Sequence, residues 1–351
     1  MTGGAARDGK SIFVTAQDGL RLHVKEYGSR TAPGVPVVCL PGLTRTVSDF
    51  AALAPALAND MALPRRVIAI DSRGRGQSDY DSNPDNYNLA VELADVATVL
   101  TALGVRPAVF IGSSRGGLLT MLMGVAHPTA IAGVVLHDIG PVIELKGLVR
   151  LKSYVGKLPA PRSFADGAEI LRRLFAAQFP LVTAEGWLAA ARRTWLMKDD
   201  ALTPTYDVRL ARTLADIDIE RPLPPLWNEF DSLVRVPMLV IHGANSDILS
   251  AATVEAMAAH LLGIDSLEHM AHLADLGRRH QHGRGELFIG CRQMLDPFPI
   301  ALEWFFAVRS KFWRARRCAF EIKCKECGSN RKGQATFYTT VRKSICSSRD
   351  T

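Results

Sequence analysis

The segment Gly112–Gly116, which reads GSSRG, is the part of this sequence best suited to covalent chemistry. It follows the apolar run Val109–Ile111 and precedes a helical pattern, so Ser114 falls on a sharp turn between a strand and a helix. The two glycines at its ends are the positions where a Cβ would keep strand and helix apart. A helix N-terminus also favours the negative charge that develops when a hydroxyl attacks a carbonyl. The spacing predicts Ser114, rather than Ser113, as a nucleophile.

A serine hydroxyl is a weak nucleophile and needs a base that is itself oriented by an acid. The chain order expected with this turn is serine, acid, histidine. Asp247 follows the apolar strand pattern Met238–His242 and is the predicted acid, and Asp138, after the preceding strand, is the alternative. His269 follows a short apolar run and is the predicted base, with His272 as the alternative.

Two backbone N–H groups should stabilise the negative oxygen of the reaction intermediate. One is the N–H of Arg115, directly after the nucleophile. The second is expected from Leu43, in the turn after the apolar strand Val37–Leu40, where Gly42 permits a tight bend. Each such donor is typically worth about 3 kcal/mol of transition-state stabilisation.

The elements around these residues alternate between strands and helices, which predicts βαβ units and a mostly parallel sheet covered on both faces. The expected strands are Val35–Leu40, Arg66–Ile70, Ala108–Ile111, Ile131–Leu136 and Val236–His242. The expected helices are Ser48–Ala58, Asn88–Leu103, Gly117–Ala126 and Ala251–Leu262. Before them, Asp18-Gly19 between two alternating runs predicts a β-hairpin.

Residues 142–230 lack a clear strand pattern and read as amphipathic helices interrupted by prolines. A helical segment between two strands of one sheet is interpreted as a lid. Its apolar residues fit either an acyl pocket or the packing of the lid itself; they are Leu171, Leu174, Phe175, Trp187, Trp195 and Trp227.

The loop Asp71–Ser78 matches a phosphate-binding glycine pattern only loosely, because no glycine stands at the third position. We expect Asp71 and Arg73 to hold this turn beside the nucleophile, which is a structural role.

Taken together, five motifs resemble the α/β-hydrolase superfamily, in its lidded esterase, lactonase and acyltransferase-like branch. The motifs are LPGLTR (40–45), DSRGRGQSD (71–79), GSSRGG (112–117), HDIGP (137–141) and VPMLVIHGANSDIL (236–249). The resemblance covers roughly residues 11–275 and implies an α/β-hydrolase fold with Ser114 as nucleophile and Asp247 as acid. The serine argues against haloalkane dehalogenases and epoxide hydrolases, which carry an aspartate at that turn.

The resulting prediction is a serine hydrolase that cleaves small to medium carboxylic esters through an acyl-enzyme, without a cofactor or metal. A lactonase, a C–C hydrolase, a perhydrolase or an acyltransferase on the same fold are alternatives, because a fold does not determine chemistry. A catalytically impaired member that only binds a ligand is a second alternative. The expected partner is a small-molecule ester or lactone, and the sequence does not indicate the oligomeric state.

Charge and cysteine divide the chain near residue 275. Residues 1–275 contain 26 Lys and Arg against 29 Asp and Glu, whereas residues 276–351 contain 16 against 6. The net charge of +7 therefore belongs to the C-terminal part, so nucleic-acid binding by the whole fold is not expected. One cysteine in the first 290 residues and no long apolar stretch predict a cytoplasmic protein without a membrane span.

The predicted domains are therefore a core of residues 1–141 and 231–275, a lid of residues 142–230, and a basic C-terminal extension of residues 276–351. Only 22 residues separate Asp247 from His269, and 82 residues follow His269, where the resembling families end after one helix. A deletion or reading-frame change near residues 259–276 would explain both features, and a genuinely appended segment is the alternative. The single Cys324-x-x-Cys327 pair lacks the second pair that structural zinc needs.

Overall fold

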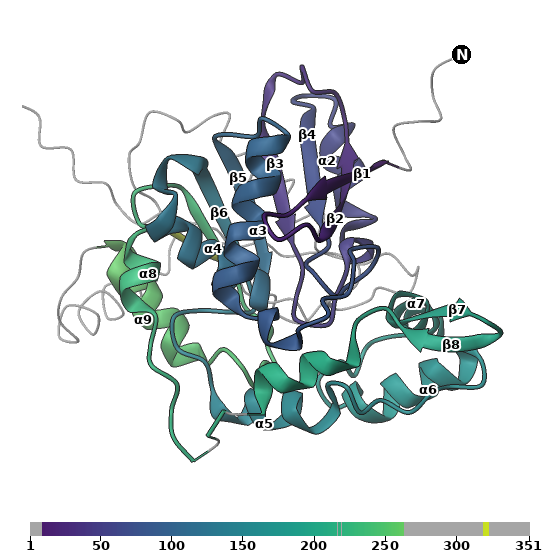
Figure 1. Cartoon of the computed structure of the whole chain (residues 1–351). Helices are drawn as coiled ribbons and strands as arrows, with labels where there is room; N and C mark the ends of the chain where they lie inside the picture. Colours follow the sequence, from purple (N-terminus) through teal and green to yellow (C-terminus); the bar gives the residue numbers. More distant parts are fainter. Residues whose placement is uncertain (1–8, 216, 219, 263–318, 323–351) are drawn as a thin grey trace, which may run out of the picture.

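A computed structural model describes residues 9–215, 217–218, 220–262 and 319–322 of the chain. In this part, eight strands form one twisted sheet in the order β1-β2-β4-β3-β5-β6-β9-β10 (Figure 1). The strands are β1 (Lys10–Thr15), β2 (Arg21–Tyr27), β3 (Gly34–Leu40), β4 (Arg65–Ile70), β5 (Ala108–Ser113), β6 (Ile131–His137), β9 (Met238–Ile241) and β10 (Ala319–Ile322).

The first two strands are antiparallel and the rest of the sheet, from β4 onward, is parallel. The Asp18-Gly19 hairpin is confirmed: β1 pairs with β2, and Gly19 takes a φ of +89° at the turn. A glycine adopts that angle without steric cost. The predicted α/β fold with a mostly parallel central sheet is therefore confirmed.

The central strands are buried on both faces, which explains why they read as uninterrupted apolar runs. Alternate residues of β3 contribute to two separate cores, because successive side chains of a strand point to opposite faces. Val38 and Leu40 belong to the core on one face, and Val37 and Cys39 belong to the core on the other. Burial raises the pKa of the Cys39 thiol, so this cysteine packs as a small apolar side chain.

Within the described residues, helices pack on both faces of the sheet, with more of them on one face than on the other. One face is covered by α2 (Leu53–Ala58), preceded by the 3-10 helix η1 (Val47–Phe50). The opposite face packs against α3 (Leu89–Ala102), α4 (Arg115–Ala126), α8 (Trp227–Asp231) and α9 (Ala251–Leu262). The start of α3 is set by Asn88, whose side-chain oxygen accepts the N–H of Val91.

Residues 142–230 connect β6 to β9 and carry their own elements, which except for α8 lie below the sheet in Figure 1. These are α5 (Leu145–Tyr154), α6 (Phe164–Phe175), α7 (Ala184–Thr194), β7 (Trp195–Lys198), β8 (Ala201–Pro204) and the 3-10 helix η4 (Val208–Leu214), followed by α8. The expectation of no strand in this segment is wrong, because β7 and β8 form an antiparallel hairpin. Its turn is Asp199-Asp200, and both residues take a positive φ, as two-residue hairpin turns require.

The segment 142–230 has a small core of its own. Leu171, Trp187 and Trp195 are buried there together with Ala191 and Leu202. Phe175 is partly buried against this core, so four of the six apolar residues considered for an acyl pocket pack this segment, which is the second interpretation given for them above.

Hydrogen bonds fasten segment 142–230 to the loop that follows β4. The N–H of Gly76 donates to the carbonyl of Thr205 at 2.7 Å, and the N–H of Asp207 donates to the carbonyl of Gly74 at 2.8 Å. The Tyr87 hydroxyl, at the start of α3, also donates to Asp207 at 2.6 Å. Segment 142–230 thus lies against the loops at the carboxyl ends of the strands, where open α/β sheets place their sites.

One short piece of the C-terminal part is described. Residues 319–322 form β10, which pairs in parallel with β9 at the sheet edge. Four residues of the predicted C-terminal extension therefore belong to the central sheet. The short apolar run before His269 and the rest of residues 276–351 lie outside the described part of the chain.

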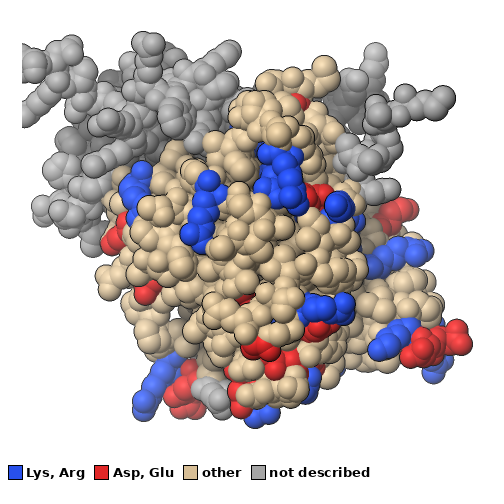
Figure 2. Space-filling view, turned by 45° about the horizontal axis from the view of Figure 1, so that its top comes forward, with Lys and Arg blue, Asp and Glu red and all other residues tan. Residues whose placement is uncertain are grey.

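Charged side chains of the two signs are interspersed over the face seen in Figure 2, with broad uncharged areas between them. The described residues of that face therefore show no continuous basic surface. Among the described helices, none is long and apolar enough to cross a membrane.

Candidate active site

Ser114 stands at the junction of β5 and α4 with a strained backbone. Its φ of 48° and ψ of −115° lie outside the regions that non-glycine residues normally occupy. Such strain is typical of functional positions, where the surrounding structure must hold it in place. Ser114 occupies the N-cap position of α4, but its side chain makes no capping hydrogen bond, in contrast to Ser163 before α6 and Thr183 before α7. Its hydroxyl is thus not used to cap the helix.

The two glycines of the turn are required by close backbone contacts. A Cβ on Gly112 would lie 2.5 Å from the carbonyl oxygen of Gly116, and a Cβ on Gly116 would lie 2.1 Å from the carbonyl oxygen of Leu40. Both distances are far below van der Waals contact, and both partners are backbone atoms that cannot rotate away. The structural reason predicted for these glycines is therefore present.

The turn after β3 lies against the nucleophile. A Cβ on Gly42 would be 3.7 Å from the Cβ of Ser114, and the N–H of Arg45 closes the turn on the carbonyl of Gly42 at 3.1 Å. The two residues predicted as oxyanion donors, Leu43 and Arg115, therefore flank Ser114 from two different elements.

A residue that the sequence did not single out, Arg75, contacts this turn. Its Nε donates to the carbonyl oxygen of Leu43 at 2.8 Å, and its guanidinium also pairs with Glu92 of α3 at 2.8 Å. Glu92 in turn pairs with Arg115 at 2.7 Å. Burial alone would raise the pKa of Glu92, but the two arginine charges lower it below its ordinary value. Glu92 is therefore held as a carboxylate.

Asp71 and Arg73 hold the loop after β4, in agreement with the structural role expected for them. Asp71 accepts the N–H of Val47 at 2.8 Å and lies 2.7 Å from Nδ1 of His23. Arg73 binds Asp95 of α3 through two hydrogen bonds of 2.7 Å.

The predicted acid Asp247 lies in the loop after β9, and both of its carboxylate oxygens are engaged by Arg150 of α5. The two bonds are 2.6 and 2.8 Å long and form a bidentate pair. Burial would raise the pKa of Asp247, but Arg150 lowers it below its ordinary value. In this structure Asp247 therefore ties segment 142–230 to the core.

The alternative acid, Asp138, directly follows β6, the neighbour of the strand that carries the nucleophile. Its φ is +53°, and one carboxylate oxygen accepts the N–H of Gly243 at 3.0 Å. Among the described residues other than glycine, positive φ angles occur at this residue, at Ser114 and at the two turn residues of the β7–β8 hairpin. The two outliers that are not in a hairpin turn thus end adjacent strands of the sheet.

The predicted bases His269 and His272 lie outside the described residues. Two other histidines, His260 and His137, have contacts of their own within the described residues. His260 stacks on Trp227 with ring centres 4.2 Å apart and pairs with Asp231, as expected for a surface position. Nδ1 of His137, at the end of β6, lies 2.9 Å from Oγ of Ser113, so the serine beside the nucleophile has a partner of its own.

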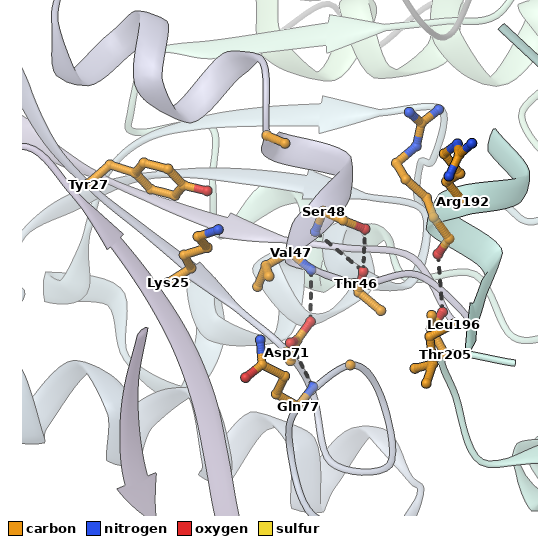
Figure 3. A pocket seen from close by; sticks show the side chains of 13 residues that line it. Lys25, Tyr27, Thr46, Val47, Ser48, Asp71, Gln77, Arg192, Leu196 and Thr205 are labelled. Atoms are coloured by element: carbon orange, nitrogen blue, oxygen red, sulfur yellow. Dashed lines mark hydrogen bonds between the residues drawn. The ribbon is translucent and has the colours of Figure 1, made fainter. Parts of the chain in front are cut away.

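A cavity of about 290 Å³ lies beside the loop after β4 and next to segment 142–230. Figure 3 shows Lys25 and Tyr27 of β2 on one side of it and Arg192 and Leu196 on the other. Ser114 does not line it. Beside it, the N–H groups of Val47 and Gln77 donate to the carboxylate of Asp71, so the residues that line this cavity hold the surrounding loops together.

The chain belongs to the alpha/beta hydrolase fold family, whose model matches residues 35–273. It is 31% identical over 255 residues to a 3-hydroxybutyrate-oligomer hydrolase of Cupriavidus necator, covering 71% of this chain and 85% of that protein. A non-heme chloroperoxidase of Streptomyces lividans is 28% identical over 270 residues, covering 74% and 92%. Among solved structures, an alpha/beta hydrolase from Novosphingobium aromaticivorans is 34% identical with a TM-score of 0.65, covering 79% of this chain and all of that one.

These relatives support hydrolase activity for this chain. The family is the one that the five sequence motifs indicated.

Proposed function

We propose that this protein hydrolyses carboxylic esters through an acyl-enzyme formed on Ser114. The observation that carries the proposal is the strained Ser114 backbone at the β5–α4 junction, with the Gly42-Leu43 turn packed against it. Strain of this kind is retained where it positions a reacting group. The similarity to a hydrolase of 3-hydroxybutyrate oligomers supports the same class of bond, since such oligomers are esters.

In the proposed reaction, Oγ of Ser114 attacks the ester carbonyl while a histidine takes its proton. The negative oxygen is bound by the N–H groups of Leu43 and Arg115. The histidine then protonates the leaving alcohol, and water hydrolyses the acyl-enzyme by the same steps. His269 is proposed as this base, with His272 as the second candidate.

The acid that orients the histidine is assigned to Asp138 in preference to Asp247. Each oxygen of Asp247 already accepts one bond from Arg150, so a histidine would have to share an oxygen with that arginine through a remaining lone pair. Asp138 follows the strand beside β5, and within the described part of the chain its carboxylate accepts one hydrogen bond, from the N–H of Gly243. The assignment reverses the order of preference that chain position alone predicted.

Segment 142–230 is proposed as a lid over the carboxyl ends of the strands. Its contacts with the loop after β4 and with Asp247 hold it against the same edge that carries Ser114. The proposed substrates are small to medium esters, including esters of short hydroxy acids, and a lactone is the cyclic form of the same bond. Residues 276–351 are proposed as an extension that adds strand β10 to the sheet edge and supplies no catalytic residue.

The test is hydrolysis of p-nitrophenyl butyrate by the wild type, Ser114→Ala and Ser113→Ala. Ser113 is the matched control, because it is the adjacent serine and its hydroxyl contacts His137 instead. We expect Ser114→Ala to lose activity by a factor on the order of 10⁴ or more, and Ser113→Ala to retain most of it. A fluorophosphonate probe should label Ser114 in the wild type. Equal hydrolysis by the wild type and Ser114→Ala would refute the proposal and leave a ligand-binding role.

A further inference from the structure

We infer that Arg75 and Glu92 are positioning residues of the oxyanion hole, which link the residues that carry its two N–H donors. The inference rests on the proposed function and extends it to side chains that do not touch the substrate. Arg75 lies in the loop after β4 and Glu92 in the first turn of α3, so neither belongs to the nucleophile turn or to the turn after β3.

The link is a continuous chain of charge-assisted hydrogen bonds. At one end, Nε of Arg75 donates to the carbonyl oxygen of Leu43 at 2.8 Å, while Nη1 binds Glu92 at 2.8 Å. At the other end, Glu92 accepts from Nε and Nη2 of Arg115 at 2.7 and 3.2 Å. The carbonyl of Leu43 and the side chain of Arg115 are thereby held by one carboxylate and one guanidinium.

Holding the carbonyl of Leu43 and the side chain of Arg115 constrains the two backbone N–H donors. The N–H of Leu43 lies in the same peptide plane as the carbonyl of Gly42, which accepts the N–H of Arg45 at 3.1 Å. Arg75 holds the next peptide plane, that of the Leu43 carbonyl, so both planes of the turn are restrained. An anchored side chain on Arg115 restricts the first residue of α4, whose N–H follows the nucleophile. Oxyanion stabilisation depends on donors that are oriented before the reaction starts, because reorientation during the reaction would cost part of the gain.

The burial of these groups makes the arrangement rigid. Arg75 is fully buried and Glu92 is 1% exposed, while Arg115 is 14% exposed. Nη1 of Arg75 also donates to the carbonyl of Arg73 at 2.6 Å, which leaves little freedom for its side chain. Buried charges carry a large desolvation penalty, and replacing one partner leaves the others uncompensated.

The same helix offers a matched control. Asp95 lies one turn after Glu92 on α3 and is also buried, and it pairs with Arg73 of the same loop through two bonds of 2.7 Å. The other carboxylates bound to Arg73 are Asp18 and Asp81. The side chains of this second network contact neither Leu43 nor Arg115, and they meet the first network only through the backbone carbonyl of Arg73. They therefore share the burial and chemistry of the first network without a side-chain link to the donors.

The experiment compares Glu92→Gln with Asp95→Asn for p-nitrophenyl butyrate hydrolysis and for Tm. Both substitutions remove one buried charge and should lower Tm. We expect kcat to fall by about 10-fold or more in Glu92→Gln with KM nearly unchanged, because the donors act in the transition state. We expect kcat of Asp95→Asn to stay within about 2-fold of the wild type.

Arg115→Met provides a second measurement that does not depend on a fully buried site. It retains the backbone N–H of residue 115 and changes a side chain that is partly exposed. It removes the anchor to Glu92 together with a longer bond of 3.3 Å to the carbonyl of Tyr87. We expect a loss of kcat in the same direction as for Glu92→Gln, with KM again nearly unchanged.

Equal kcat values for Glu92→Gln and Asp95→Asn would overturn the inference. So would a raised kcat in Glu92→Gln, because that variant adds net positive charge and would favour the oxyanion if charge alone mattered. Failure of the proposed function gives a different result, in which Ser114→Ala hydrolyses the ester as fast as the wild type.

Discussion

The carboxyl edge of the sheet is built differently around Ser114, which follows β5, and around the two candidate acids, which follow β6 and β9. The first region is called the nucleophile end and the second the acid end. At the nucleophile end, Ser114 is enclosed by glycines that permit no Cβ, and buried ion pairs reach the flanking turns. At the acid end, Asp138 follows β6 and Asp247 follows β9, and Arg150 of segment 142–230 forms an ion pair with Asp247. The first end is held by close backbone contacts and buried ion pairs, and Leu43 also packs on Tyr206 and Leu210 of segment 142–230. The second end depends on a partly exposed ion pair with that segment.

This difference between the two ends predicts how well each of them should tolerate amino-acid substitutions. Adding an atom group at a close backbone contact, or removing one partner of a buried charge, lowers the free energy of unfolding strongly. Removing a partly exposed ion pair lowers it far less. We therefore expect the nucleophile end to be rigid and intolerant of substitution, and the acid end to be adjustable.

The largest expected effect is that of Asp138→Asn. Without its carboxylate the histidine loses its orientation and the charge that stabilises its protonated form, so kcat should fall by a factor on the order of 10⁴. Hydrolysis of p-nitrophenyl butyrate measures this, with Asp247→Asn as the control, for which we expect a change below about 10-fold. The reverse order of the two losses would show that Asp247 is the acid.

Gly116→Ala tests the rigidity of the nucleophile end. The new Cβ would meet the carbonyl oxygen of Leu40, so we expect the free energy of unfolding to fall by about 3 kcal/mol. Chemical denaturation measures this loss. The control is Gly133→Ala in β6, where the nearest atom is 3.4 Å away, and its loss should be below about 1 kcal/mol. Similar losses for both variants would contradict the contrast between the two ends.

Arg150→Met tests the adjustable end. Removing the bidentate pair with Asp247 should lower the free energy of unfolding by about 1 kcal/mol, because the pair is partly exposed. If Asp138 is the acid, kcat for a small ester stays close to that of the wild type. A clear rise in kcat would instead mean that Arg150 withholds Asp247 from the histidine.

The smallest effect concerns His137, which ends β6 and contacts Ser113 of β5. Burial lowers the pKa of His137 below its ordinary value, although the charges of Asp138 and Asp49 oppose this. The unfolded chain therefore binds the proton more readily, and stability should decline as pH falls through about 6.5. The drop in Tm between about pH 7.5 and about pH 5.5 should be smaller in His137→Gln than in the wild type.

The control for this measurement is His260→Gln, since His260 is 40% exposed and pairs with Asp231 at the surface. Its drop in Tm should match that of the wild type. If Tm of His137→Gln falls as much as that of the wild type over this pH range, protonation of His137 does not contribute to the pH dependence of stability.

The strands and helices of the core were predictable because each one carries its own pattern. The helix expected at 251–262 has those bounds in the structure, and the expected strands match within a few residues. The β7–β8 hairpin was missed because its strands have four residues each and its turn is Asp-Asp without glycine. Such short runs do not show a period that separates strand from helix.

The candidate site was predictable only in part. The nucleophile turn is a continuous stretch of chain, and the glycines that it needs stand at fixed distances from Ser114. The role inferred for Arg75 has no local signal, because its partners Leu43 and Glu92 lie 32 and 17 residues away. The pair of Arg150 with Asp247 joins residues 97 positions apart, so the sequence could not show that the predicted acid is engaged.

By itself the sequence determined the βα order, the strained serine turn and the family, since each of these depends on neighbouring residues and their spacing. Only the tertiary structure decided which charges meet beneath the turns at Leu43 and Arg115, and that Asp247 pairs with Arg150. Those choices depend on side chains brought together from distant segments. A buried charge must find a partner wherever the fold places one, and the linear order of residues does not reveal that partner.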